Sequence, residues 1–109
     1  PAGGRLRSAQ AAGEHWTLSL APSDSLEHAA RFAWGTGPAA TGTLVEDATS
    51  ANDALRFKGT LTTAEGDRPA TVTFATERCV DDGDKAHDHT VRVEVRGIDV
   101  EQGCGDITR

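Results

Sequence analysis

Apolar and polar residues alternate along several short stretches of the chain. The first runs over residues 14–21 and the clearest over residues 90–96, where three valines alternate with polar and charged residues. A period of two places the apolar side chains on one face of an extended backbone. Both stretches therefore predict β-strands with one buried face.

Similar stretches recur at the spacing of hairpins. Residues 41–46, 55–61, 71–74 and 98–100 combine apolar or β-branched residues with polar ones, and turn residues separate them. No stretch shows a long helical period. The pattern predicts an all-β fold, a small antiparallel β-barrel or sandwich of about seven to eight strands.

Residues 26–34 are open to two interpretations. As a strand, they place His28 and Trp34 on the same face as three apolar residues; as a helix, Asp24 and Glu27 provide a capping start. We favour the strand because glycine and proline in residues 35–38 end the stretch after nine residues.

The connections between strands give further expectations. Gly59 lies within one alternating stretch and indicates a bend or bulge, as small closed sheets often need. Residues 64–69 predict a hairpin connection longer than two residues, and residues 47–53 a polar loop. After Gly97 the apolar positions shift to Ile98 and Val100, which predicts a turn into a short final strand.

A length of 109 residues fits one domain with a single core. Residues 1–13 are small, polar and aperiodic, which predicts a flexible N-terminal linker. The folded domain is then expected to span residues 14–109 as a monomer.

The two cysteines are Cys79 and Cys104. We interpret them as one disulfide that clamps a pair of strands. Closing a loop of about 25 residues contributes roughly 3–4 kcal/mol through chain entropy. Such a bond indicates an oxidising compartment; the alternative is two unrelated buried thiols.

Seventeen acidic and eleven basic residues give a net charge of −6, and the basic residues are scattered. Nucleic-acid binding is not expected, because a phosphate backbone requires a cationic stripe. The acidic surface suits a basic partner protein or serves solubility alone.

No apolar run approaches the roughly 20 residues of a membrane span. We expect a targeting segment or lipid anchor upstream of residue 1, as in processed envelope proteins.

His87 and His89 lie two residues apart, which places both imidazoles on one side of an extended backbone. With Asp81, Asp82 and Asp84 they form the most metal-like cluster in the sequence. Zinc needs three or four placed ligands, and the acidic pattern of a calcium loop is missing. We therefore expect a solvated, charged loop and no cofactor. The alternative is a metal or small-ligand site at the two histidines.

Motifs for other chemistry are weak. The sequence contains no nucleophile elbow and no phosphate-binding glycine loop. Carboxylates that converge in the fold leave a weak hydrolase as a third hypothesis. Trp16 and Trp34 are expected to fill the core, the alternative being that one lines a ligand cleft at the mouth of a barrel.

Short motifs mark the two ends of the domain. Residues 13–18 (Gly-Glu-His-Trp-Thr-Leu) are similar to an opening Gly-x-Glu-Pro-aromatic-Trp-x-Leu motif. A closing set of motifs consists of Cys-x-Asp-(Gly)-Met-Ser, an aromatic-Pro-aromatic step, an alternating strand and Gly-Cys-(Gly/Ala). Parts of this set are similar to residues 79–83, 90–97 and 103–105. In these motifs the chain resembles a family of small bacterial envelope proteins, often lipoproteins and mostly of unknown function. The family's Met-Ser step is missing, and residues 87–89 replace its aromatic-Pro-aromatic step.

This resemblance implies a periplasmic or outer-membrane-anchored protein. Domains of this kind resemble small disulfide-bearing β-barrels that inhibit c-type lysozyme, although the inhibitors' Ser-Gly-x-(Arg/Lys)-Tyr loop is absent and the chain contains no tyrosine. We expect a non-enzymatic protein-binding or structural module, inhibitor-like in its action on a basic envelope protein. Its expected contact surface is the loop carrying Asp81, Asp82, Asp84, His87 and His89.

Overall fold

The computed structural model describes residues 7–23, 25–47, 54–98 and 100–108. Over these residues the chain forms β-strands and no helix, which confirms the all-β prediction. The strands are β1 (Ser8–Ala12), β2 (Trp16–Leu20), β3 (Glu27–Trp34), β4 (Ala40–Glu46), β5 (Ala54–Thr63), β6 (Gly66–Ala75), β7 (Cys79–Val80), β8 (Ala86–His87), β9 (His89–Val95) and β10 (Glu101–Thr108).

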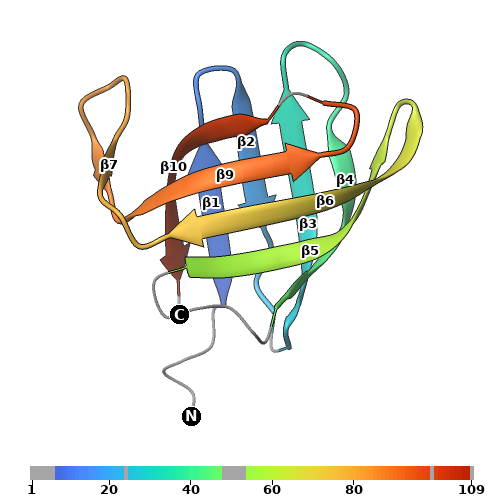
Figure 1. Cartoon of the computed structure of the whole chain (residues 1–109), viewed down its shortest axis with the longest axis horizontal. Coiled ribbons are helices and arrows are strands. Elements are labelled where there is room, and N and C mark those ends of the chain that lie inside the picture. Colours follow the sequence, from blue (N-terminus) through green and yellow to red (C-terminus); the bar gives the residue numbers. More distant parts are fainter. Residues whose placement is uncertain (1–6, 24, 48–53, 99, 109) are drawn as a thin grey trace.

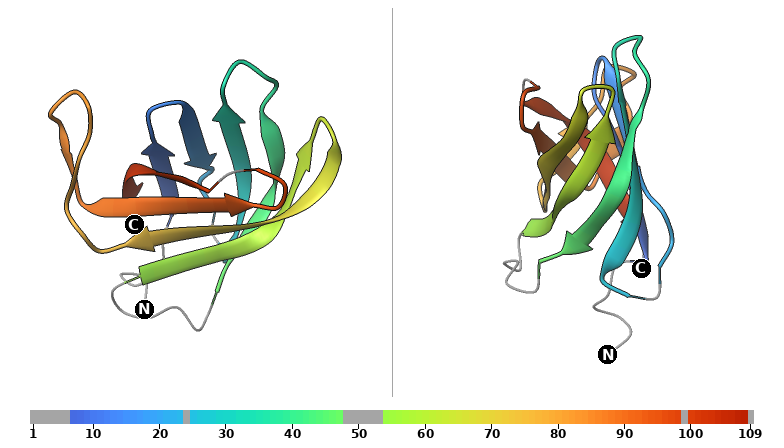
Figure 2. Two further views of the ribbon diagram at one scale, coloured as in Figure 1. Left: turned by 45° about the horizontal axis from the view of Figure 1, so that its top comes forward. Right: turned by 90° about the vertical axis from the view of Figure 1, so that its right-hand side faces the viewer.

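Eight of these strands close into an antiparallel barrel in the order β1-β10-β9-β6-β5-β4-β3-β2 (Figure 1). The remaining two, β7 and β8, form a separate two-stranded sheet. This β7–β8 hairpin stands outside the barrel, on the side where β6 ends and β9 begins (Figure 2). The barrel alternative of the predicted fold is therefore the observed one.

The segment predicted as a linker contributes a strand to the barrel. Residues 8–12 form β1, which pairs with β2 on one side and with β10 on the other. Ala9 and Ala11 face the core and are 2% and 7% exposed. The prediction of a flexible linker is therefore wrong for residues 8–12, and the domain begins before residue 14. Residues 1–6 lie outside the described residues.

The interior of the barrel is filled by alternate side chains of β1–β6 and β9, and Ile107 of β10 packs partly buried against them. Phe32, Phe57 and Phe74 are at most 1% exposed, and the rings of Phe57 and Phe74 meet edge to face with centroids 5.9 Å apart. Trp16 belongs to this core, as predicted, and Trp34 packs partly buried against it. The other buried apolar residues are Ala9, Ala11, Leu18, Leu20, Ala30, Ala40, Leu44, Leu61, Ala70, Val72, Val91, Val93 and Val95.

The ambiguous stretch at 26–34 is a strand, β3, with alternating exposed and buried residues. Its inward face includes His28, which is 1% exposed. The Nδ1 atom of His28 lies 2.9 Å from the carbonyl oxygen of Ala21, and its ring meets Phe57 edge-on. A hydrogen bond to the backbone allows the polar ring to occupy a core position. The helical alternative is wrong.

The connections differ from the predictions in two places. The β5–β6 hairpin turns through two residues, 64 and 65, and the pairing resumes at Gly66, whose φ of 109° suits glycine. The predicted longer connection is therefore wrong. The final strand begins at Glu101 rather than at Ile98, because the N–H of Ile98 donates to Val95 O (3.0 Å) within the β9–β10 turn.

Gly59 does not mark a bulge, since strand pairing continues through it on both sides. A Cβ at this position would overlap the carbonyl oxygen of Thr43, and one at Gly42 would overlap that of Thr60. The two glycines thus allow β4 and β5 to approach closely. The loop predicted at 47–53 lies outside the described residues, apart from Asp47.

Candidate functional site

The turn of the β7–β8 hairpin is organised by one carboxylate. Asp81 Oδ1 accepts hydrogen bonds from the backbone N–H groups of Gly83 (2.8 Å) and Lys85 (3.0 Å). The N–H of Asp84 donates to Asp81 O (3.0 Å), and Asp84 adopts a φ of 62°. Aspartate and glycine favour such turns, because the carboxylate binds nearby backbone donors and both residues tolerate a positive φ. The acidic loop therefore has a defined conformation of its own.

A disulfide between Cys79 and Cys104, whose Cα atoms are 5.4 Å apart, holds the base of the hairpin against the barrel. The predicted bond is confirmed, but it does not clamp two adjacent strands. Cys104 on β10 pairs with Thr90 of β9 and Ala12 of β1, whereas Cys79 belongs to β7. The bond therefore attaches the hairpin to the outer wall of the barrel.

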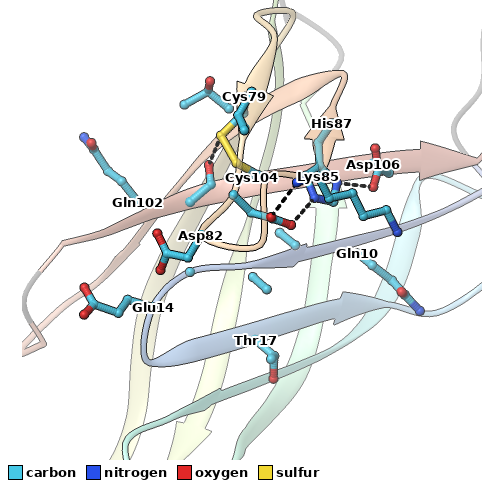
Figure 3. A pocket seen from close by; sticks show the side chains of 18 of the residues that line it. Gln10, Glu14, Thr17, Cys79, Asp82, Lys85, His87, Gln102, Cys104 and Asp106 are labelled. Atoms are coloured by element: carbon cyan, nitrogen blue, oxygen red, sulfur yellow. Dashed lines mark hydrogen bonds and ion pairs between the residues drawn. A yellow bond between two sulfur atoms is a disulfide. The ribbon is translucent and has the colours of Figure 1, made fainter.

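A second link joins the hairpin to the same strand. Asp106 follows Cys104 by two residues on β10, so both side chains point outward. The ring of His87 lies between two carboxylates: Nδ1 is 2.6 Å from Asp106 Oδ2, and Nε2 is 2.8 Å from Asp81 Oδ2 (Figure 3). An imidazolium can donate to both carboxylates at once, whereas a neutral imidazole has only one N–H. We call this Asp81–His87–Asp106 arrangement the histidine clasp.

The electrostatics of the histidine clasp favour its charged form. The hydrogen bond to Asp81, and next that to Asp106, raises the pKa of His87 above its ordinary value of 6.5. The hydrogen bond from His87, and next that from the backbone of Lys85, lowers the pKa of Asp81 below its ordinary value of 3.8. Between these two ordinary values both partners are therefore charged in the folded protein.

A groove of about 1020 Å³ lies between the hairpin and the barrel wall. One side is formed by β1, β2 and β10 and the other by the hairpin (Figure 3). Its uncharged polar lining includes Gln10, Thr17 and Gln102, and no described phenylalanine or tryptophan lines it. Its charged lining residues are Glu14, Asp81, Asp82, Asp106, Lys85 and His87. Carboxylates therefore outnumber cations in the groove.

The structure separates the residues predicted as a contact surface. Asp81, Asp82 and His87 line the groove, whereas Asp84 is exposed at the hairpin turn. His89 begins β9 inside the barrel, where it is 8% exposed and packs against Phe74 with ring centroids 6.1 Å apart. The expectation that both imidazoles share one side is wrong, because the chain bends between β8 and β9. Within the described ranges, no three His, Cys, Asp or Glu residues are arranged to hold a metal ion.

Two acidic groove residues, Asp106 and Glu14, are absent from the sequence-based site. Asp106 was recognisable in principle, because it has the same parity as Cys104 on a strand and must face the disulfide-bonded hairpin. Glu14 lies in the β1–β2 turn, and nothing in the local sequence places that turn beside the hairpin.

The two motif-bearing ends of the chain meet beside this groove. The indole Nε1 of Trp16 donates to the carbonyl oxygen of Gln102 (3.3 Å), and the N–H of Gly13 donates to Trp16 O (3.0 Å). No family model, curated protein or solved structure matches the chain. The resemblance to bacterial envelope proteins therefore stays a prediction from motifs. Over the residues that the structure covers, no helix is long and apolar enough to cross a membrane.

Proposed function

We propose that the protein is a binding module whose groove receives a basic segment of another protein. The observation that carries this proposal is the groove itself, a preformed recess of about 1020 Å³ beside a hairpin that is tied to the barrel at two points. A preformed recess reduces the entropy lost on binding, because the chain does not have to be ordered by its partner.

Charge complementarity supports a basic occupant. Figure 3 shows the side chains of Glu14 and Asp82 toward one end of the groove and that of Asp106 toward the other. Lysine and arginine side chains of a partner can reach these carboxylates while their aliphatic stems lie along the recess. Such pairs select the partner and accelerate encounter more than they add affinity.

The histidine clasp favours binding over acid–base catalysis. A general base needs a free ring nitrogen within reach of a substrate proton. Both ring nitrogens of His87 already lie within hydrogen-bond distance of carboxylates. The groove lining also contains no serine, and its cysteines are joined in the disulfide.

The disulfide and the motif resemblance support a proposal for the compartment. A structural disulfide persists in oxidising surroundings such as the bacterial periplasm. Together with the envelope-protein motifs, this supports a periplasmic or outer-membrane-anchored module whose partner is a basic envelope protein, with a hydrolase as the inhibitor-like case.

A hexa-arginine peptide tests the proposal by titration followed in ¹H–¹⁵N NMR spectra. We expect the largest shift changes at residues lining the groove. The double variant Glu14→Gln/Asp82→Asn removes two exposed groove charges without altering the histidine clasp. At about 0.2–1 kcal/mol per exposed ion pair, it should weaken binding roughly 2- to 30-fold.

The matched control is Glu27→Gln/Glu65→Gln, which removes the same charge at exposed positions that do not line the groove. It should bind the peptide nearly as well as the native chain. Equal weakening in the two double variants, or shift changes spread evenly over the barrel, would show that only net charge attracts the peptide and would remove the groove from the proposal.

A further inference from the structure

We propose that His87 is a pH-operated clasp that fixes the hairpin against the barrel at low pH and releases its outer part as the pH rises. This switch changes the motion of the hairpin in the free protein. As regulation of partner binding, it rests on the proposed function.

The hairpin has two attachments of different kinds. Cys79 fixes its first residue to Cys104, and this covalent bond does not respond to pH. His87, which pairs with Cys79 across the hairpin, contacts Asp106 on the barrel at 2.6 Å. Its other ring nitrogen contacts Asp81, through which the turn beyond the disulfide is held. The disulfide and the His87–Asp106 contact both end on β10, two residues apart. Loss of the His87–Asp106 contact leaves the hairpin hinged at the disulfide.

His87 also joins the barrel wall to the turn of the hairpin. Asp81 Oδ2 contacts its Nε2, while Asp81 Oδ1 accepts the two backbone N–H groups that shape the turn. An imidazolium therefore connects β10, β8 and the hairpin turn through one ring. A neutral ring keeps a single N–H, so one of its two carboxylates loses its hydrogen bond and both lose the opposite charge.

The charged residues around His87 also favour opening of the clasp when its ring loses a proton. Besides Asp81 and Asp106, the groove presents Asp82 and Lys85 from the hairpin turn and Glu14 from the β1–β2 turn, whereas β1 presents the uncharged Gln10. Deprotonation of His87 leaves four carboxylates facing a single lysine. Repulsion between the carboxylates of the hairpin and those of the barrel then favours a wider groove.

The direction of the switch follows from the pKa of His87, which the two carboxylates raise. The clasp is closed between pH 3.8 and 6.5, the ordinary pKa values of Asp81 and His87, and opens as the pH rises through the raised pKa of His87 in the folded protein. A moderately acidic compartment thus holds the groove narrow, and an alkaline one widens it.

Backbone ¹⁵N relaxation of the free, disulfide-bonded chain at about pH 5.5 and about pH 9 tests the proposal, since a histidine changes charge within this range. At the lower pH, amide order parameters for residues 80–86 should match those of the barrel strands, about 0.85. At the higher pH they should fall toward about 0.6, the level of flexible segments, while the barrel is unchanged.

Three variants separate the clasp from other sources of pH dependence. His87→Gln should be mobile at both pH values, and His87→Arg, a permanent cation with several donors, should stay ordered at both. His15→Gln is the control: His15 is exposed and its contact with Glu14 is 3.7 Å long, so its variant should behave as the native chain does.

Equal order of the native hairpin at both pH values, or pH-dependent order that persists in His87→Gln, would overturn the clasp. Neither result depends on peptide binding, so the clasp and the proposed function can fail separately.

Discussion

Removal of the disulfide should weaken the protein substantially without abolishing the barrel. The bond closes a loop over a sequence separation of 25 residues. The chain-entropy relation gives about 12 cal/mol/K for a loop of this length, or about 3.5 kcal/mol at 25 °C. Small domains have about 5–15 kcal/mol of stability, so a folded state is expected to survive.

The structure explains why the barrel should persist. Every neighbouring strand pair of the barrel, including the closing β1–β10 pair, is formed by backbone pairing that does not involve the sulfur atoms. The bond attaches only the β7–β8 hairpin to the outer wall. The test uses the double variant Cys79→Ala/Cys104→Ala. Alanine is chosen over serine because Cys104 is only 6% exposed, and a serine there would bury an unpaired hydroxyl.

Thermal and urea unfolding, followed by the fluorescence of Trp16 and Trp34, measure the effect. With about 2.1 cal/mol/K of unfolding entropy per residue over this chain, 3.5 kcal/mol corresponds to a decrease in Tm of roughly 15 °C. Native protein reduced with a phosphine should show a similar decrease. A decrease below about 5 °C would refute the loop-entropy argument. Complete unfolding of the variant would refute the claim that the closed sheet is stable independently of the disulfide.

Two further predictions concern packing and pH. Gly42→Ala places a methyl group against the carbonyl oxygen of Thr60 and should lower the free energy of unfolding by about 1–3 kcal/mol. The control Gly37→Ala has open space around it and should change this free energy by less than about 0.5 kcal/mol. Urea midpoints of the two variants measure the difference, and equal midpoints would contradict the packing argument. The stability that His87 contributes should be complete below pH 6.5 and lost as the pH rises through its raised pKa, while that from Asp81 should be present above pH 3.8 and lost as the pH falls through its lowered pKa. Urea unfolding measured at a series of pH values should show stability falling on the alkaline side in the native chain and in His15→Gln but not in His87→Gln. The same fall in His87→Gln would show that the pH dependence does not come from His87.

The strands with alternating apolar residues were predictable from the sequence because their buried side chains are large. Residues 90–96 and 55–61 correspond closely to β9 and β5 for this reason. Strand β1 was missed because its inward residues are Ala9 and Ala11, whose small side chains give little hydrophobic contrast. The barrel closes through this strand, and pairing between the two ends of a chain has no local signal.

The candidate site was predictable only in part, because it is assembled from distant segments. The acidic loop could be recognised from its aspartates and glycine, and the disulfide from the cysteine pair, whereas the short β7–β8 pairing that turns this loop into a hairpin was not predicted. The histidine clasp needs Asp106 on β10 and His87 on β8, which are 19 residues apart. The prediction that His87 and His89 lie on one side was wrong because a bend at Asp88 places the first ring in the groove and the second in the core.

An NMR titration of the His87 ring in the native chain and in Asp106→Ala tests the central structural claim, that an imidazolium joins the hairpin to the barrel wall. We expect a midpoint above 6.5 in the native chain, with both ring nitrogens protonated below it, and a lower midpoint once Asp106 is removed. A native midpoint at or below 6.5, or one that Asp106→Ala leaves unchanged, would contradict this claim.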